Sequence, residues 1–88
     1  MFKFHEEDLD MYICTADAQS RKRTTLEMTQ EVFDFLSARI TDAIYITVEH
    51  EKFYKGHPIV IDASLRSSKV IKMSTPKENL YYSWYIGG

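Results

Sequence analysis

The sequence predicts an α+β protein, in which a single helix packs on one face of a mostly antiparallel sheet of four to six strands. One helix signature lies between Thr24 and Ile40, and the other apolar segments are short and alternate like strands. The length of 88 residues suits one domain with one core. We therefore expect residues 1–88 to form a single compact domain with the order β-β-α-β-β-β-β.

The predicted helix covers residues 24–40. Thr24 and Glu27 have the spacing of a capping box, in which the Thr hydroxyl and the Glu carboxylate each accept a hydrogen bond from a free backbone N–H. The apolar residues that follow recur at steps of three and four and form one stripe. These residues are Val32, Phe33, Leu36 and Ile40.

Two strands are predicted before the helix, at residues 2–4 and 9–16. The polar segment 5–8 separates them, so they could pair as a hairpin. In the second strand one face would carry Leu9, Met11 and Ile13, and the other Tyr12, Cys14 and Ala16.

Four strands are predicted after the helix, at residues 43–49, 59–63, 69–73 and 80–86. Residues 50–58 read as a loop or a wide turn, and their Gly56 and Pro58 are typical turn residues. Thr75, Pro76 and Glu78 resemble a helix start of one turn at most. The predicted core is Met11, Ile13, Val32, Phe33, Leu36, Ile40, Ile44, Ile46, Val48, Ile59, Ile61, Trp84 and Ile86.

Composition excludes several classes of function. Thirteen acidic and eleven basic residues give a net charge of −2, which makes nucleic acid an unlikely partner. The single Cys14 excludes an internal disulfide and favours a reducing, cytoplasmic setting. No segment has the apolar length of a membrane span. The histidines match no metal-ligand spacing, and we expect no metal, no cofactor and no enzymatic activity.

Tyrosines suggest a binding surface. A single helix covers one face of a sheet, and strand alternation places Tyr12, Tyr45, Tyr81 and Tyr85 on the other. Tyrosine is favoured at interfaces, so this face predicts a protein-binding module of the inhibitor, immunity or host-modulating kind, such as a phage or mobile element could encode. A homo-oligomer is a further expectation. The same rings could instead pack on each other as ordinary sheet-surface residues.

A basic run provides the first alternative. Arg21, Lys22 and Arg23 precede the predicted helix, where positive charge opposes the helix dipole. Together with the tyrosines, they could form a nucleic-acid-binding surface. The plainer interpretation of the run is a solvated loop.

The C-terminus provides the second alternative. A β-β-α-β-β order that ends in Gly87-Gly88 resembles the ubiquitin-like β-grasp group. That resemblance implies activation or conjugation at the terminal carboxylate. The sequence departs from the group's pattern because Trp84, Tyr85 and Ile86 continue as a strand up to the diglycine, where the family has a flexible tail.

Overall fold

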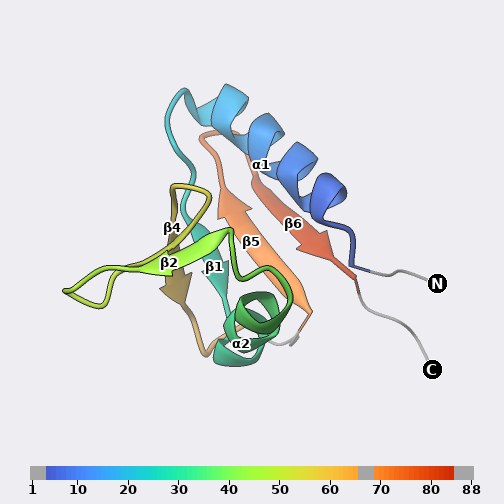
Figure 1. Cartoon of the computed structure of the whole chain (residues 1–88). Helices are drawn as coiled ribbons and strands as arrows, with labels where there is room; N and C mark the ends of the chain where they lie inside the picture. The colour runs from blue at the N-terminus through green and yellow to red at the C-terminus, as the bar shows by residue number, and fades with distance from the viewer. Residues whose placement is uncertain (1–3, 66–68, 85–88) are drawn as a thin grey trace.

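The computed structural model describes residues 4–65 and 69–84, which contain two α-helices and six strands. This confirms the predicted α+β class, but the prediction of a single helix is wrong. The elements are α1 (Glu6–Ser20), β1 (Leu26–Met28), α2 (Gln30–Arg39), β2 (Ile44–Ile46), β3 (Lys52–Tyr54), β4 (His57–Ile61), β5 (Val70–Ser74) and β6 (Asn79–Ser83) (Figure 1). A helix at the start replaces the expected pair of strands, so the element order that resembled a β-grasp protein is absent.

The six strands form one sheet in the order β2-β3-β4-β1-β5-β6. Strands β1 and β4 pair in parallel, and the other four neighbouring pairs are antiparallel. The prediction of a mostly antiparallel sheet is therefore confirmed. The central strand β1 comes early in the chain, and α2, β2 and β3 lie between it and its parallel neighbour β4. Such a non-local pairing leaves no short-range signal in the sequence.

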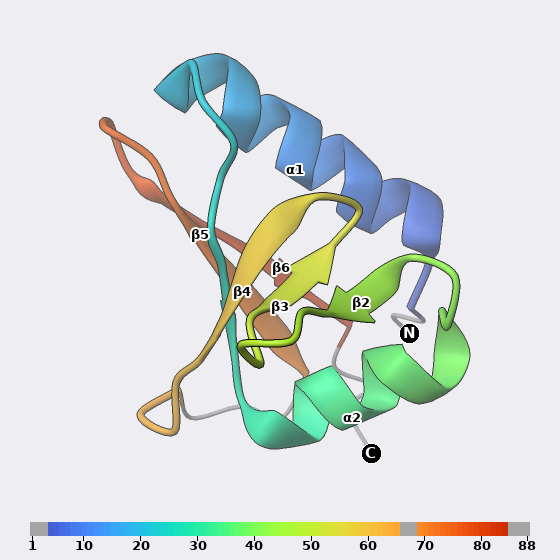
Figure 2. The same cartoon turned by 60° about the vertical axis from the view of Figure 1, so that its left-hand side comes forward.

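Both helices cover the same face of the sheet, and the other face has no helix over it (Figure 2). On β3, Lys52 and Tyr54 point to one face because they are two residues apart. The Tyr54 hydroxyl reaches α1, where it donates to Asp10. The Lys52 ammonium lies 5.6 Å from the centre of the Phe33 ring on α2. We call the uncovered face the open face.

Helix α1 occupies the segment predicted as the strand 9–16. Its buried residues Leu9, Ile13 and Ala16 follow steps of four and three, which is the helical period. Met11, predicted as core, is 63% exposed. Phe4 belongs to no strand but is buried, and residues 2 and 3 lie outside the described part.

The N-cap of helix α2 lies five residues later in the chain than predicted. Thr29 is the N-cap, and its hydroxyl accepts a hydrogen bond from the Val32 N–H at 3.3 Å. The predicted capping box of Thr24 and Glu27 is therefore wrong, because Glu27 belongs to β1. The predicted stripe still faces inward: Val32, Phe33 and Leu36 are buried.

The segment predicted as a loop at 50–58 contains strand β3 and a tight hairpin. Lys55 and Gly56 connect β3 to β4, and both have positive φ, at 48° and 84°. A two-residue connection with both φ values positive is the turn that matches strand twist, and glycine adopts it at low cost. The hairpin brings Tyr54, which is completely buried, into the core.

Most of the remaining residues predicted as core are buried or partly buried. Ile13, Ile59 and Trp84 are buried as predicted, and Ile40, Ile44 and Ile61 are partly buried against the core. The predictions for Ile46 and Val48 are wrong. Ile46 is 54% exposed on the edge strand β2, and Val48 is 92% exposed in the turn that follows this strand. Ile86 lies outside the described residues. Core residues that were not predicted include Leu9, Leu26, Met28, Tyr54, Ile71, Met73 and Tyr82.

The start signal at Thr75 forms a turn and no helix. The Glu78 N–H donates to the Thr75 hydroxyl at 3.1 Å, and the chain passes directly into β6. Among the described residues, neither helix is long and apolar enough to cross a membrane.

Candidate functional site

The structure separates the predicted tyrosine surface. Tyr45 on β2 and Tyr81 on β6 both lie on the open face and are about half exposed, at 52% and 50%. Tyr12 lies on α1, on the helix-covered side, where its ring centre is 5.2 Å from that of Tyr82. Its predicted place beside Tyr45 and Tyr81 is wrong. Tyr85 lies outside the described residues.

Apolar side chains gather on the open face at the β2 edge of the sheet. Strand register places Tyr45 opposite Phe53, and Phe53 opposite Pro58. The rings of Tyr45 and Phe53 stack with their centres 4.9 Å apart and their planes 13° apart. Val60 lies two residues beyond Pro58 on the same face and is 47% exposed. We call Tyr45, Phe53, Pro58 and Val60 the β2–β4 patch.

Tyr81 does not belong to this patch. The register runs from Val60 through Glu27 and Lys72 to Tyr81, so two charged residues separate the patch from the tyrosine. Five strand spacings between β2 and β6 amount to roughly 24 Å along the sheet. Among the described residues, the open face thus carries an apolar patch at one edge, opposite charges in the middle and Tyr81 at the other edge.

The basic run follows a helix end, which corrects its predicted place before a helix start. Arg21 is the C-cap of α1, and its N–H donates to the Asp17 carbonyl at 2.8 Å. Positive charge is favourable there, so the run needs no anionic partner to explain it. The Arg23 guanidinium donates to the Gly56 carbonyl at 3.0 Å, and Lys22 is exposed. Arg23 thereby ties the run to the β3–β4 turn.

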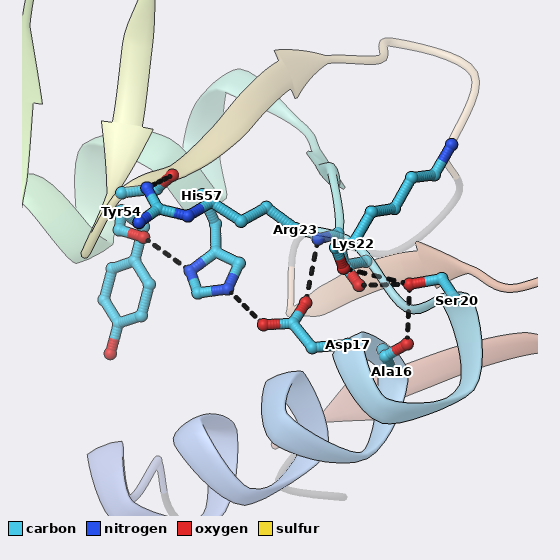
Figure 3. Close-up of polar contacts among 9 residues, drawn as sticks. Ala16, Asp17, Ser20, Lys22, Arg23, Tyr54 and His57 are labelled. Carbon is cyan, nitrogen blue, oxygen red and sulfur yellow. Dashed lines mark hydrogen bonds and ion pairs between the residues drawn. The ribbon is translucent and has the colours of Figure 1, made fainter.

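A cluster of polar side chains connects α1 to this hairpin (Figure 3). Asp17 contacts the Nε2 atom of His57 at 2.7 Å and accepts from the Thr24 N–H at 2.8 Å. The Nδ1 atom of His57 lies 3.3 Å from the Tyr54 carbonyl. A carboxylate and a carbonyl can only accept, so each contact is a hydrogen bond when the ring nitrogen that faces it carries a proton.

The pKa of the Asp17 carboxyl reflects these contacts. Partial burial acts to raise the pKa, but hydrogen bonds from His57 and Thr24 and the attraction of His57 outweigh it. The pKa of Asp17 therefore lies below its usual value of 3.8. The carboxyl group is ionised at neutral pH and serves as a stable acceptor.

A second set of contacts lies two to three turns earlier on α1. Asp10 accepts from the Tyr54 hydroxyl at 2.9 Å and pairs with the Lys55 ammonium at 2.6 Å. Lys55 also pairs with Glu6. Burial raises the pKa of the Tyr54 phenol, and the neighbouring Asp10 raises it further, so the hydroxyl remains a donor. We call Asp10, Asp17, Tyr54, Lys55 and His57 the α1–hairpin cluster.

A pocket of about 240 Å³ lies at this cluster and includes the Cys14 side chain. Cysteine and histidine together are a nucleophile and a base in some enzymes. Here, however, both nitrogens of His57 already face acceptors, so the ring has no nitrogen left to activate the thiol. The described residues also place no group of three or more His, Cys, Asp or Glu side chains where they could hold a metal ion. The contacts of the cluster hold α1 against the β3–β4 hairpin.

Sequence reasoning did not find this cluster. Its key partners Asp17 and His57 are 40 residues apart, and no motif joins them. Only a correct helical assignment for α1 would have placed Asp10 and Asp17 on one side, two turns apart. Comparison with protein-family models, with curated proteins and with solved structures found no match, so the proposals below rest on this geometry alone.

Proposed function

We propose that this protein is a non-enzymatic binding module that acts by direct contact with another protein, as an inhibitor, an immunity-type protein or a host-modulating protein. The observation that carries the proposal is the β2–β4 patch on a sheet face that neither helix covers. Stacked aromatic rings and a half-exposed valine there leave apolar surface in water. Covering such a patch is favourable, since apolar area removed from water contributes roughly 25 cal/mol per Å².

The composition of the patch also fits an interface. Tyrosine and phenylalanine give large contact areas and lose little conformational freedom when they are fixed. The stacking of Tyr45 and Phe53 already restricts both side chains, so binding costs little further side-chain entropy. Glu27 and Lys72 beside the patch provide a polar border that can set the orientation of a partner.

The cytoplasm is the compartment that we propose. Cys14 is a free and exposed thiol, and such a group persists in a reducing environment.

The test compares two exposed apolar residues that are each replaced by lysine. Val60→Lys places a charge in the β2–β4 patch, and Met11→Lys places the same charge on α1 as the control. Tagged forms of the wild-type protein and both variants are used to capture proteins from the native host, and each captured protein is then purified and titrated. A partner should bind wild type and Met11→Lys alike and lose at least tenfold in affinity for Val60→Lys.

Thermal melts of the three proteins establish that folding is unchanged. If every captured protein binds Val60→Lys as tightly as wild type, the β2–β4 patch is not the interface and the proposal fails.

A further inference from the structure

A second apolar surface lies on the other side of the sheet, between α1 and β6. Helix α1 runs alongside β6, as Figure 1 shows, and the two elements are in contact. Between them lies a groove of about 210 Å³, lined by Met11, Tyr12, Thr15 and Leu80. Met11 is 63% and Tyr12 41% exposed, although both face this groove. None of these residues belongs to the β2–β4 patch.

The wall opposite α1 is an edge strand with unpaired backbone groups. β6 is the last strand of the sheet, and within residues 4–65 and 69–84 no strand pairs with its outer side. The Trp84 N–H donates to the Lys69 carbonyl of the inner neighbour. Because hydrogen-bonding direction alternates along an antiparallel strand, the N–H and C=O groups of Tyr81 and Ser83 point outward. An extended chain can pair with them.

One end of the groove is acidic. Asp8 lies one helical turn before Met11 and Tyr12 and is exposed. Asp8 precedes Tyr12 by four residues, so it lies on the same face of α1 as the Tyr12 ring that contacts Tyr82 of β6. A basic side chain on an incoming segment would find a partner there, and an acidic one would be repelled.

We propose that this groove binds an extended peptide segment of a partner protein, which adds a strand to the outer edge of β6, buries an apolar side chain between Met11 and Leu80, and places a lysine or arginine beside Asp8. Main-chain hydrogen bonds hold such a segment, and the pocket for alternate side chains selects its sequence. An amphipathic helix would also cover the apolar residues, but it would leave the β6 backbone unpaired. An extended segment satisfies both features, so the geometry favours it.

The inference stands apart from the proposed function, because the β2–β4 patch and the groove lie on opposite faces of the sheet. One pair of variants distinguishes them: Met11→Lys alters the groove, and Val60→Lys alters the patch. Each is the matched control of the other, since both place a lysine at an exposed apolar position.

The test uses phage-displayed random dodecapeptides selected on the immobilised full chain. Enriched sequences should show apolar residues at alternate positions with lysine or arginine nearby. The corresponding synthetic peptides, carrying a fluorescent label, should bind with an affinity that Met11→Lys lowers at least tenfold. Val48→Lys, at a 92% exposed residue that belongs to neither surface, should leave this affinity unchanged. Methylation of alternate backbone nitrogens in the peptide should abolish binding, because it removes strand pairing. Amide shifts on titration should map to α1 and β6.

Three results would overturn the inference. One is a selection that enriches no peptide. Another is a set of peptides that bind Met11→Lys and wild type equally well. The third is binding that survives backbone methylation. Peptides that bind wild type and Met11→Lys but not Val60→Lys would overturn the groove proposal and indicate binding at the β2–β4 patch. The two proposals can therefore fail independently.

Discussion

Replacing Asp17 with alanine removes the acceptor at the centre of the α1–hairpin cluster. The Thr24 N–H then loses its partner in a residue that is only 3% exposed, and a buried donor without an acceptor costs about 1–3 kcal/mol. The contact with His57 is partly screened, because the Asp17 side chain is 32% exposed, and it adds about 1 kcal/mol. We expect the free energy of unfolding to fall by about 2–4 kcal/mol, from about 4–13 kcal/mol for a chain of this length.

The same loss should depend on pH. The pKa of Asp17 is lower in the folded than in the unfolded protein, so its ionised form stabilises the fold above its ordinary pKa of 3.8. That contribution is lost as the pH falls below 3.8 and through the folded-state pKa. The difference in stability between wild type and Asp17→Ala should therefore shrink as the pH falls from 4 to 3.

Urea unfolding followed by Trp84 fluorescence measures these differences. Asp17→Asn keeps an oxygen for Thr24 and should lose only about 1 kcal/mol. Asp42→Ala removes a carboxylate from an exposed position and should change stability by less than about 0.5 kcal/mol. An Asp17→Ala loss no larger than that of Asp42→Ala, or one that is unchanged at pH 3, would refute the role given to the cluster.

Three further outcomes follow from the fold. Trp84→Ala should cost about 3–5 kcal/mol in unfolding experiments followed by circular dichroism, because the ring is 3% exposed among other aromatic rings, and a loss below 1 kcal/mol would contradict its place in the core. Thr29→Ala should cost about 1 kcal/mol through loss of the α2 cap, whereas an unchanged midpoint would argue against the cap. Gel shifts at physiological salt should show little binding to DNA or RNA. Tight, salt-dependent binding that is lost on changing Arg21, Lys22 and Arg23 to alanine would reverse this expectation.

The error at α1 shows how far the pattern of apolar residues can mislead. Leu9, Met11 and Ile13 alternate, as strand residues do, but Leu9, Ile13 and Ala16 also fit a helical stripe. Both periods are present, and the structure buries the second set. The acidic first turn, Glu6 to Asp8, favoured the helix, because negative charge stabilises a helix N-terminus.

Strand β1 was missed for a different reason. Residues 26–28 are too few to establish a period, and their strand character comes from pairing with β4 on one side and β5 on the other. Both partners lie more than thirty residues away in the chain. The apolar stripe of α2 needed no distant partner, and it was predicted correctly from Val32 to Leu36.

For the candidate surfaces too, the features that depend on local sequence were predicted and those that depend on distant pairing were not. Tyr45 and Tyr81 were correctly placed on an open face, because alternation within each strand determines that face locally. The distance between them depends on strand order, which no local pattern carries, and so one predicted surface became two. Tyr12 moved to the helix side with the reassignment of α1.

Helix α1 links these parts of the molecule. One side of it is fixed to the β3–β4 hairpin by Asp10 and Asp17, and the other side forms a wall of the groove beside β6. Polar contacts at one side of the helix therefore help to position the wall of the groove at its other side. The same hairpin carries Phe53 and Pro58 of the β2–β4 patch, next to the cluster residues Tyr54 and His57. Under the groove proposal, we expect a change in the α1–hairpin cluster to alter peptide binding, since the cost of positioning α1 enters that equilibrium.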